Sequence, residues 1–205
     1  MNKKRFTIIL IVFFGALTLS IGLNIRNASE QNEIKRGMLN HAFSELISIY
    51  RGLDSLIYGI ENEAADVKTA RQGLIMLSRR LTRLDAILGW YATSFRPRGV
   101  WRNHYTGFIN FDFISSTLTA SRFAIGDVLY YGIMESSVMS DNEILYLSIL
   151  RDDISVIIAS MASADNPLQE NQNLTVYQMD NILNEFFSRW SIFYEGSPFF
   201  LLQSE

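Results

Sequence analysis

Residues 33–60 read EIKRGMLNHAFSELISIYRGLDSLIYGI, and their apolar spacing is the strongest structural signal in the chain. Large apolar side chains recur in this stretch at alternating steps of four and three residues, at Leu39, Phe43, Leu46, Tyr50, Leu53, Ile57 and Ile60. This spacing places them along one side of an α-helix, as in a coiled coil or helical bundle. We therefore predict a helix over residues 33–60 whose apolar seam packs against partner helices.

A second seam with the same spacing follows at Val67, Ala70, Leu74, Leu77, Leu81, Leu84, Leu88 and Tyr91. Since residues 60 and 67 are also one heptad apart, residues 33–94 can form either one long helix or two. Gly59 is typical of a helix end, and the acidic residues that follow it suit the start of a new helix. We favour two helices with a turn between residues 59 and 65.

The second half of the chain also shows helical patterns. From Asn110, apolar residues on a common side predict a helix up to Ile133. Ser140 and Glu143 form a capping-box pattern that opens a further helix, which Asn166-Pro167 ends. Strand signals are nearly absent.

A last helix is predicted from Thr175 to Gly196, and the apolar tail of residues 199–202 is expected to fold back onto the bundle. The predicted fold is all-α: an N-terminal transmembrane signal-anchor helix followed by an up-and-down bundle of four to five helices.

The N-terminal anchor is the uncharged run FTIILIVFFGALTLSIGL, residues 6–23, which follows three basic residues. At about 1.5 Å per residue, a helix continuing to Ile25 is long enough to cross a bilayer. The positive-inside rule places residues 1–5 in the cytoplasm, residues 6–25 in the membrane and residues 26–205 outside. The alternative is a signal peptide cleaved after Ser20-Ile21-Gly22, which would release a secreted protein.

The composition excludes several kinds of chemistry. The chain has no cysteine, so it lacks a lipoprotein anchor, thiol catalysis and cysteine-bound metal centres. His41 and Glu45 have a spacing used by metal ligands, but the only other histidine, His104, lies in a distant loop. We predict no metal and no cofactor. Because no catalytic motif occurs, we predict that the protein is not an enzyme.

Charge is distributed unevenly along the chain. Residues 68–102 carry eight basic side chains against Asp85, which gives +7, whereas residues 103–205 carry three basic and thirteen acidic side chains, which gives −10. The helix around the second seam therefore has a basic face opposite its leucines, formed by Lys68, Arg71, Arg79, Arg80 and Arg83.

This basic face has two interpretations. It can pair with acidic neighbours, for which the candidates are Asp152, Asp153, Asp180 and Glu185. It can instead bind an external anion: a lipid head group, an anionic wall polymer or an acidic partner protein. The predicted compartment and the net charge of −3 disfavour nucleic acid.

A second candidate surface is the segment of residues 95–113, which follows the second seam. It combines arginines with aromatic and histidine side chains, at Arg96, Arg98, Trp101, Arg102, His104, Tyr105, Phe108, Phe111 and Phe113. Such combinations are typical of recognition surfaces and membrane interfaces. Alternatively, the rings cover the open end of the bundle.

Together these patterns predict a single-pass, extracytoplasmic binding protein that contacts a partner protein or an anionic envelope component. One alternative is a small-molecule carrier or sensor bundle with a pocket lined by aromatic side chains. A further alternative is an envelope hydrolase whose residues converge only in three dimensions. The oligomeric state is left open.

Overall fold

The computed structural model describes residues 3–95, 110–120, 122–125, 128–135, 139–167, 169–190 and 196–202. Side chains are described from residue 13 onward, except at residues 92, 93, 95, 122–125, 128–131, 135, 176 and 180 within those ranges. The chain forms two compact units, Met1–Gly37 and Met38–Glu205.

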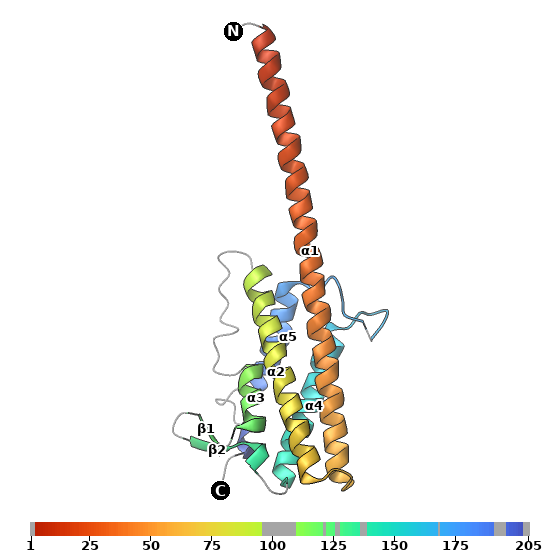
Figure 1. Ribbon diagram of the computed structural model, residues 1–205, viewed down its shortest axis with the longest axis vertical. Coiled ribbons are helices and arrows are strands. Elements are labelled where there is room, and N and C mark those ends of the chain that lie inside the picture. The colour runs from red at the N-terminus through yellow and green to blue at the C-terminus, as the bar shows by residue number, and fades with distance from the viewer. Residues whose placement is uncertain are drawn as a thin grey trace. The chain divides into compact units, whose positions relative to one another are not determined.

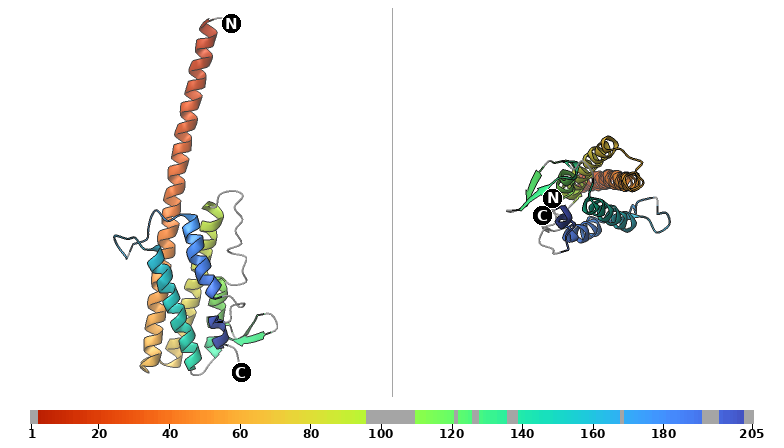
Figure 2. Two further views of the ribbon diagram at one scale, coloured as in Figure 1. Left: turned by 180° about the vertical axis from the view of Figure 1, so that it is seen from behind. Right: turned by 90° about the horizontal axis from the view of Figure 1, so that it is seen from below.

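Most of the described chain is helical. Its elements are α1 (Lys3–Glu61), α2 (Val67–Phe95), α3 (Phe111–Thr119), β1 (Arg122–Ile125), β2 (Val128–Tyr131), the 3-10 helix η1 (Ile133–Glu135), α4 (Asp141–Met161), α5 (Val176–Arg189) and the 3-10 helix η2 (Pro198–Leu202). Within the second unit, α2, α4, α5 and the part of α1 from Met38 run side by side in alternating directions (Figures 1 and 2). The prediction of a mainly helical chain is confirmed, and this arrangement is consistent with the predicted bundle.

The predicted break between the first two helices is confirmed. Helix α1 continues past Gly59 to Glu61, and Glu63 takes the left-handed conformation with φ of 53°. The backbone N–H groups of Ala64 and Ala65 both donate to the Gly59 carbonyl oxygen at 2.9 Å. Asp66 Oδ1 accepts a hydrogen bond of 2.7 Å from the Thr69 N–H. The Thr69 side chain, together with this backbone bond, lowers the pKa of Asp66. The turn therefore ends one helix and caps the next.

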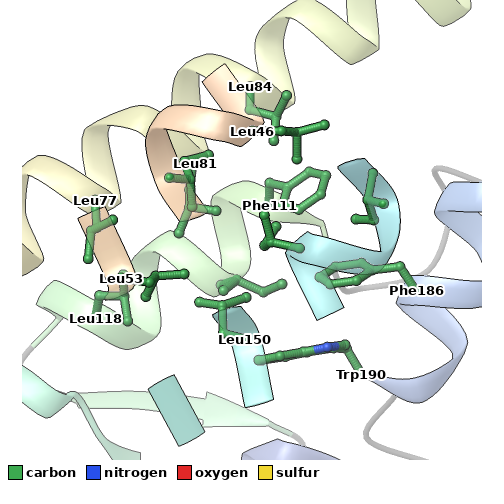
Figure 3. Close-up of a cluster of buried hydrophobic side chains, with 14 of the residues drawn as sticks. Leu46, Leu53, Leu77, Leu81, Leu84, Phe111, Leu118, Leu150, Phe186 and Trp190 are labelled. Atoms are coloured by element: carbon green, nitrogen blue, oxygen red, sulfur yellow. The ribbon is translucent and has the colours of Figure 1, made fainter. Parts of the chain in front are cut away.

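The two leucine-rich seams meet in the core of the second unit (Figure 3). Leu46 and Leu53 of α1 and Leu77, Leu81 and Leu84 of α2 are buried together with apolar side chains from α3, α4 and α5. Small residues let the first two helices approach closely. A Cβ atom at Gly52 would lie 2.9 Å from Leu77 Cδ2, and one at Gly73 would lie 3.2 Å from Leu56 Cδ1.

Two helix starts have capping boxes. Ser140 and Glu143 form the predicted one at the start of α4, and Thr175 and Gln178 form another, which was not predicted, at the start of α5. Helix α4 ends at Met161, before the predicted stop at Asn166-Pro167, because an isolated β-bridge joins Ala162 to Glu170.

The predicted helix from Asn110 to Ile133 is wrong beyond Thr119. An antiparallel hairpin of β1 and β2 follows α3, with Arg122 opposite Tyr131 and Ile125 opposite Val128. The sequence between the paired ends is Gly126-Asp127, a dipeptide typical of two-residue hairpin loops, and the flanking residues are mostly aromatic or aliphatic. These local preferences outweigh the weak helical spacing of the apolar residues.

The apolar tail packs back onto the bundle, as predicted. In η2, Phe199 and Leu202 are buried. The ring centroid of Phe199 lies 5.4 Å from that of Trp190 and 5.3 Å from that of Phe113.

Among the described residues, no helix combines the length and the apolarity needed to cross a membrane. The predicted anchor spans residues 6–25, and the side chains of residues 6–12 lie outside those that the structure describes. The anchor therefore gains no support from the structure and stays a prediction based on the sequence.

Candidate functional site

The basic face predicted for residues 67–91 lies on the outer side of α2. Lys68, Arg71 and Arg79 are exposed, and no ion pair involves them among the described residues. They lie on the opposite side of the helix from the buried leucines. These three cations are therefore available to a ligand in solvent.

Arg80 and Arg83 have a partner within the protein. Arg80 Nη1 donates to Glu45 Oε2 at 3.0 Å, and Arg83 Nη1 donates to Glu45 Oε1 at 3.1 Å. Glu45 is only 5% exposed, whereas the side chains of Arg80 and Arg83 are 36% and 62% exposed. The two arginines therefore neutralise a buried carboxylate and still reach solvent.

The acidic partner of the basic face differs from the four acidic residues predicted from the sequence. Asp153 binds Arg189, Asp152 binds Arg151, and Glu185 is exposed, whereas the side chain of Asp180 lies outside the described residues. In the sequence, Glu45 stands out only through its metal-ligand spacing to His41. Its place one residue before Leu46, at the edge of the first seam, is the sequence signal for a carboxylate facing α2.

Two large apolar side chains interrupt the basic face. Met76 is 59% exposed and Trp90 is 72% exposed. At 100° per residue, Lys68, Met76, Arg79, Arg83 and Trp90 fall within an arc of roughly 80°. We call these five residues, with Arg71 at the edge, the α2 outer face. The same helical wheel could have identified Met76 and Trp90 from the sequence.

Most of the second predicted surface lies outside the described residues, namely Arg96, Arg98, Trp101, Arg102, His104, Tyr105 and Phe108. Phe111 and Phe113 are described, and they pack in and against the core, so they do not belong to an exposed surface. The role of the other residues as a recognition loop stays a prediction.

The aromatic residues of α3 and α5 pack against one another. Phe111 stacks on Phe186 with ring centroids 5.2 Å apart, and it meets Phe187 edge-on at 5.1 Å. This packing lends no support to the interpretation of these rings as the lining of a ligand pocket.

A polar network joins α2 to α3. The hydroxyl groups of Ser78 and Ser115 share a hydrogen bond of 2.7 Å, and Thr82 Oγ1 donates to Asp112 Oδ1 at 2.9 Å. Thr82 also shares a hydrogen bond with Ser115 at 3.0 Å. No histidine or lysine takes part in this network within the described residues, so it has no evident base to activate a hydroxyl.

Asp85 holds the start of α3 from the side of α2. Its Oδ1 accepts a hydrogen bond of 3.1 Å from the Phe111 N–H. Burial raises the pKa of Asp85, and the nearby charge of Asp112 adds to this effect, while hydrogen bonds from the backbone oppose it. The folded chain therefore holds a proton on Asp85 at a higher pH than the unfolded chain does.

We expect this carboxylate to make the stability pH-dependent. With the pKa raised in the folded state, the stabilisation is present below the unfolded pKa and is lost as the pH rises through the folded pKa. An Asp85→Asn variant keeps the acceptor for the Phe111 N–H but does not titrate. As the pH rises from the unfolded-state pKa of Asp85 to its folded-state pKa, the free energy of unfolding of the variant should rise relative to that of the original chain and then level off. Urea unfolding at a series of pH values measures this difference. Asp165→Asn, at an exposed position, is the control. A difference that does not change with pH would contradict the expectation.

The arrangement on α2 offers cations and apolar contacts, which suits binding better than catalysis. No group of three or more potential metal ligands occurs among the side chains that the structure describes. No protein-family model, curated protein or solved structure matches the chain.

Proposed function

We propose that this chain is a membrane-anchored, extracytoplasmic helical-bundle protein that binds an acidic, amphipathic segment of a partner protein through the α2 outer face. The observation that carries the proposal is the exposed Trp90 and Met76 among basic side chains on one side of one helix. Tryptophan and arginine are the side chains most enriched among residues that dominate binding energies at interfaces.

The shape of the surface favours a helical segment over a lipid surface. The α2 outer face extends from Lys68 to Trp90, about 33 Å along the helix, and all of its residues except Arg71 fall within an arc of roughly 80°. A narrow stripe of this kind suits a helix laid alongside it, whose acidic and apolar residues would match the arginines and Trp90. A bilayer surface would be contacted by a broader set of side chains.

The location rests on the sequence. The run of residues 6–23 is uncharged and follows Lys3, Lys4 and Arg5, which supports an N-terminal anchor with the bundle outside the cell. If the run is cleaved after Gly22, the same surface belongs to a secreted protein.

The test is a titration of the full-length chain with a designed acidic amphipathic helical peptide. Arg79→Gln should weaken binding about threefold and Trp90→Ala about tenfold. Glu45→Gln should strengthen binding about threefold, because it releases Arg80 and Arg83 from their carboxylate partner and adds one unit of positive charge. The effects of Arg79→Gln and Glu45→Gln should shrink as salt is raised, whereas that of Trp90→Ala should not.

Arg36→Gln is the matched control, because it removes the same charge from an exposed side chain of α1 that makes no ion pair among the described residues. Equal effects of Arg79→Gln and Arg36→Gln would show that only net charge matters and would overturn the proposal. A parallel titration with soluble short-chain phosphatidylglycerol distinguishes the lipid alternative. If the variants change lipid binding and leave peptide binding unchanged, the ligand of this surface is a lipid head group.

A further inference from the structure

A polar groove of about 440 Å³ lies on the other side of the second unit, between α1 and the loop that connects α4 to α5. One wall is a row of hydrogen-bonding side chains spaced along α1, namely Asn40, Ser44, Ser48 and Arg51. The other wall consists of Gln169, Glu170 and Gln172. Its volume falls within the range of roughly 300–1,000 Å³ that is usual for small-molecule sites.

Both walls are held in place by the fold. The α1 wall is one side of a helix whose opposite side packs into the core through Leu39, Leu46 and Leu53. In the loop, the Ser163 N–H donates to the Gln169 carbonyl and the Asn171 N–H donates to the Met161 carbonyl, both at 2.7 Å. These bonds form the bridge between Ala162 and Glu170, and Leu174 anchors the end of the loop in the core.

The side chains along the groove are not engaged by the protein. Among the described residues, no hydrogen bond or ion pair involves the side chains of Asn40, Ser44, Ser48 and Arg51. Glu45, on the same helix, has both carboxylate oxygens bonded to arginines. The helix thus uses its buried polar residue for structure and presents a separate polar row to the groove.

We propose that this groove binds a neutral oligosaccharide of N-acetylated amino sugars. Amide and hydroxyl side chains can each donate and accept hydrogen bonds. Together they match a ligand that carries hydroxyl and acetamide groups. Arg51 and Glu170 contribute one charge of each sign, so the lining does not favour an anionic ligand. The apolar residues of the lining, Phe43 and Ile47, pack largely into the core. The groove therefore offers little apolar surface to an apolar ligand.

An extended peptide is the competing occupant, because amide side chains also bond to peptide groups. A peptide gains affinity and specificity chiefly from side-chain pockets or from strand addition. The groove has a helix along one wall, and its lining offers mainly polar atoms. These features favour an oligosaccharide over an extended peptide as the ligand of the groove.

The experiment is calorimetric titration of chitotriose into the full-length chain, held in a zwitterionic detergent so that no sugar head group competes. Saturable binding of one chitotriose per chain is expected. The double variant Asn40→Ala, Gln172→Ala should weaken it about tenfold, because it removes hydrogen bonds from both walls. The double variant Gln31→Ala, Asn32→Ala makes the same pair of substitutions at exposed positions of α1 outside the groove and should leave the affinity unchanged.

Absence of saturable binding at millimolar chitotriose would overturn the proposal, as would equal affinities of the double variant in the groove and the original chain. Tighter binding of trialanine than of chitotriose would identify the groove as a peptide site instead. Circular dichroism checks that both double variants are folded. Since Arg79 lies on α2, Arg79→Gln should not change chitotriose binding, which keeps this inference separate from the proposed function.

Discussion

Replacing Trp190 with alanine is expected to lower the free energy of unfolding by about 3–5 kcal/mol, the usual range for truncating a large buried ring. The side chain is fully buried. Its ring centroid lies 5.2 Å from that of Tyr146, 5.6 Å from that of Phe186 and 5.4 Å from that of Phe199. The variant therefore loses contacts with α4, α5 and η2 at once.

The same ring has a polar role. Trp190 Nε1 donates to Asp153 Oδ2 at 2.9 Å, while Arg189 Nη1 bonds to Asp153 Oδ1. Asp153 is only 5% exposed, so an unbonded oxygen there is unfavourable. Trp190→Phe isolates this contribution, because it keeps an aromatic ring and removes the donor. We expect it to destabilise the chain by about 1–3 kcal/mol.

Urea unfolding followed by circular dichroism measures both effects as a shift of the midpoint. Trp90→Ala is the matched control for stability, because Trp90 is 72% exposed, and its effect should stay within about 0.5 kcal/mol. A loss of less than 1 kcal/mol in Trp190→Ala would contradict the picture of a ring cluster that joins these elements.

Replacing Gly132 with alanine should destabilise the chain by about 3 kcal/mol, at the upper end of the range for overpacking. A Cβ atom at this position would lie 1.7 Å from the carbonyl oxygen of Ala120 and 2.8 Å from its carbonyl carbon. Both are backbone atoms, so no side chain can rotate away. The contact joins the end of β2 to the end of α3, and the hairpin would have to move to relieve the clash.

Gly89→Ala is the control, because a Cβ atom there meets nothing within 4 Å. In the interior of α2, this change should stabilise the chain by about 0.5–1 kcal/mol, since alanine favours helix more than glycine does. Opposite shifts of the unfolding midpoint in these two variants are the expected result. A neutral Gly132→Ala variant would show that the hairpin is only loosely attached to α3.

The sequence predicted the bundle where the apolar spacing was long and regular. Both leucine-rich seams and the capping box at Ser140 led to correct helices, because each combines several consistent local signals. The prediction failed at β1 and β2. Over so short a segment, Ile125, Leu129 and Ile133 fit a helical spacing by chance, whereas the dipeptide Gly126-Asp127 between the strands is the local signal for a hairpin.

The candidate surfaces were predicted less completely, for a physical reason. Helical periodicity tells which side of α2 is polar, but not which residue of another helix faces it. The ion pairs of Glu45 depend on the register between α1 and α2. The groove depends on how the β-bridge places Gln169 and Gln172 opposite Asn40, and no local pattern records that placement.

The short turn between α1 and α2 also has a consequence for the order of folding. The contacts between Gly52 and Leu77 and between Leu56 and Gly73 join residues close in sequence, so this helical hairpin can form early during synthesis. Phe199, by contrast, contacts Phe113, which is far from it in the sequence, as well as Trp190. The ring cluster is therefore completed only after α5 and η2 have both been synthesised. Until then, the ring of Trp190 lacks one of its packing partners.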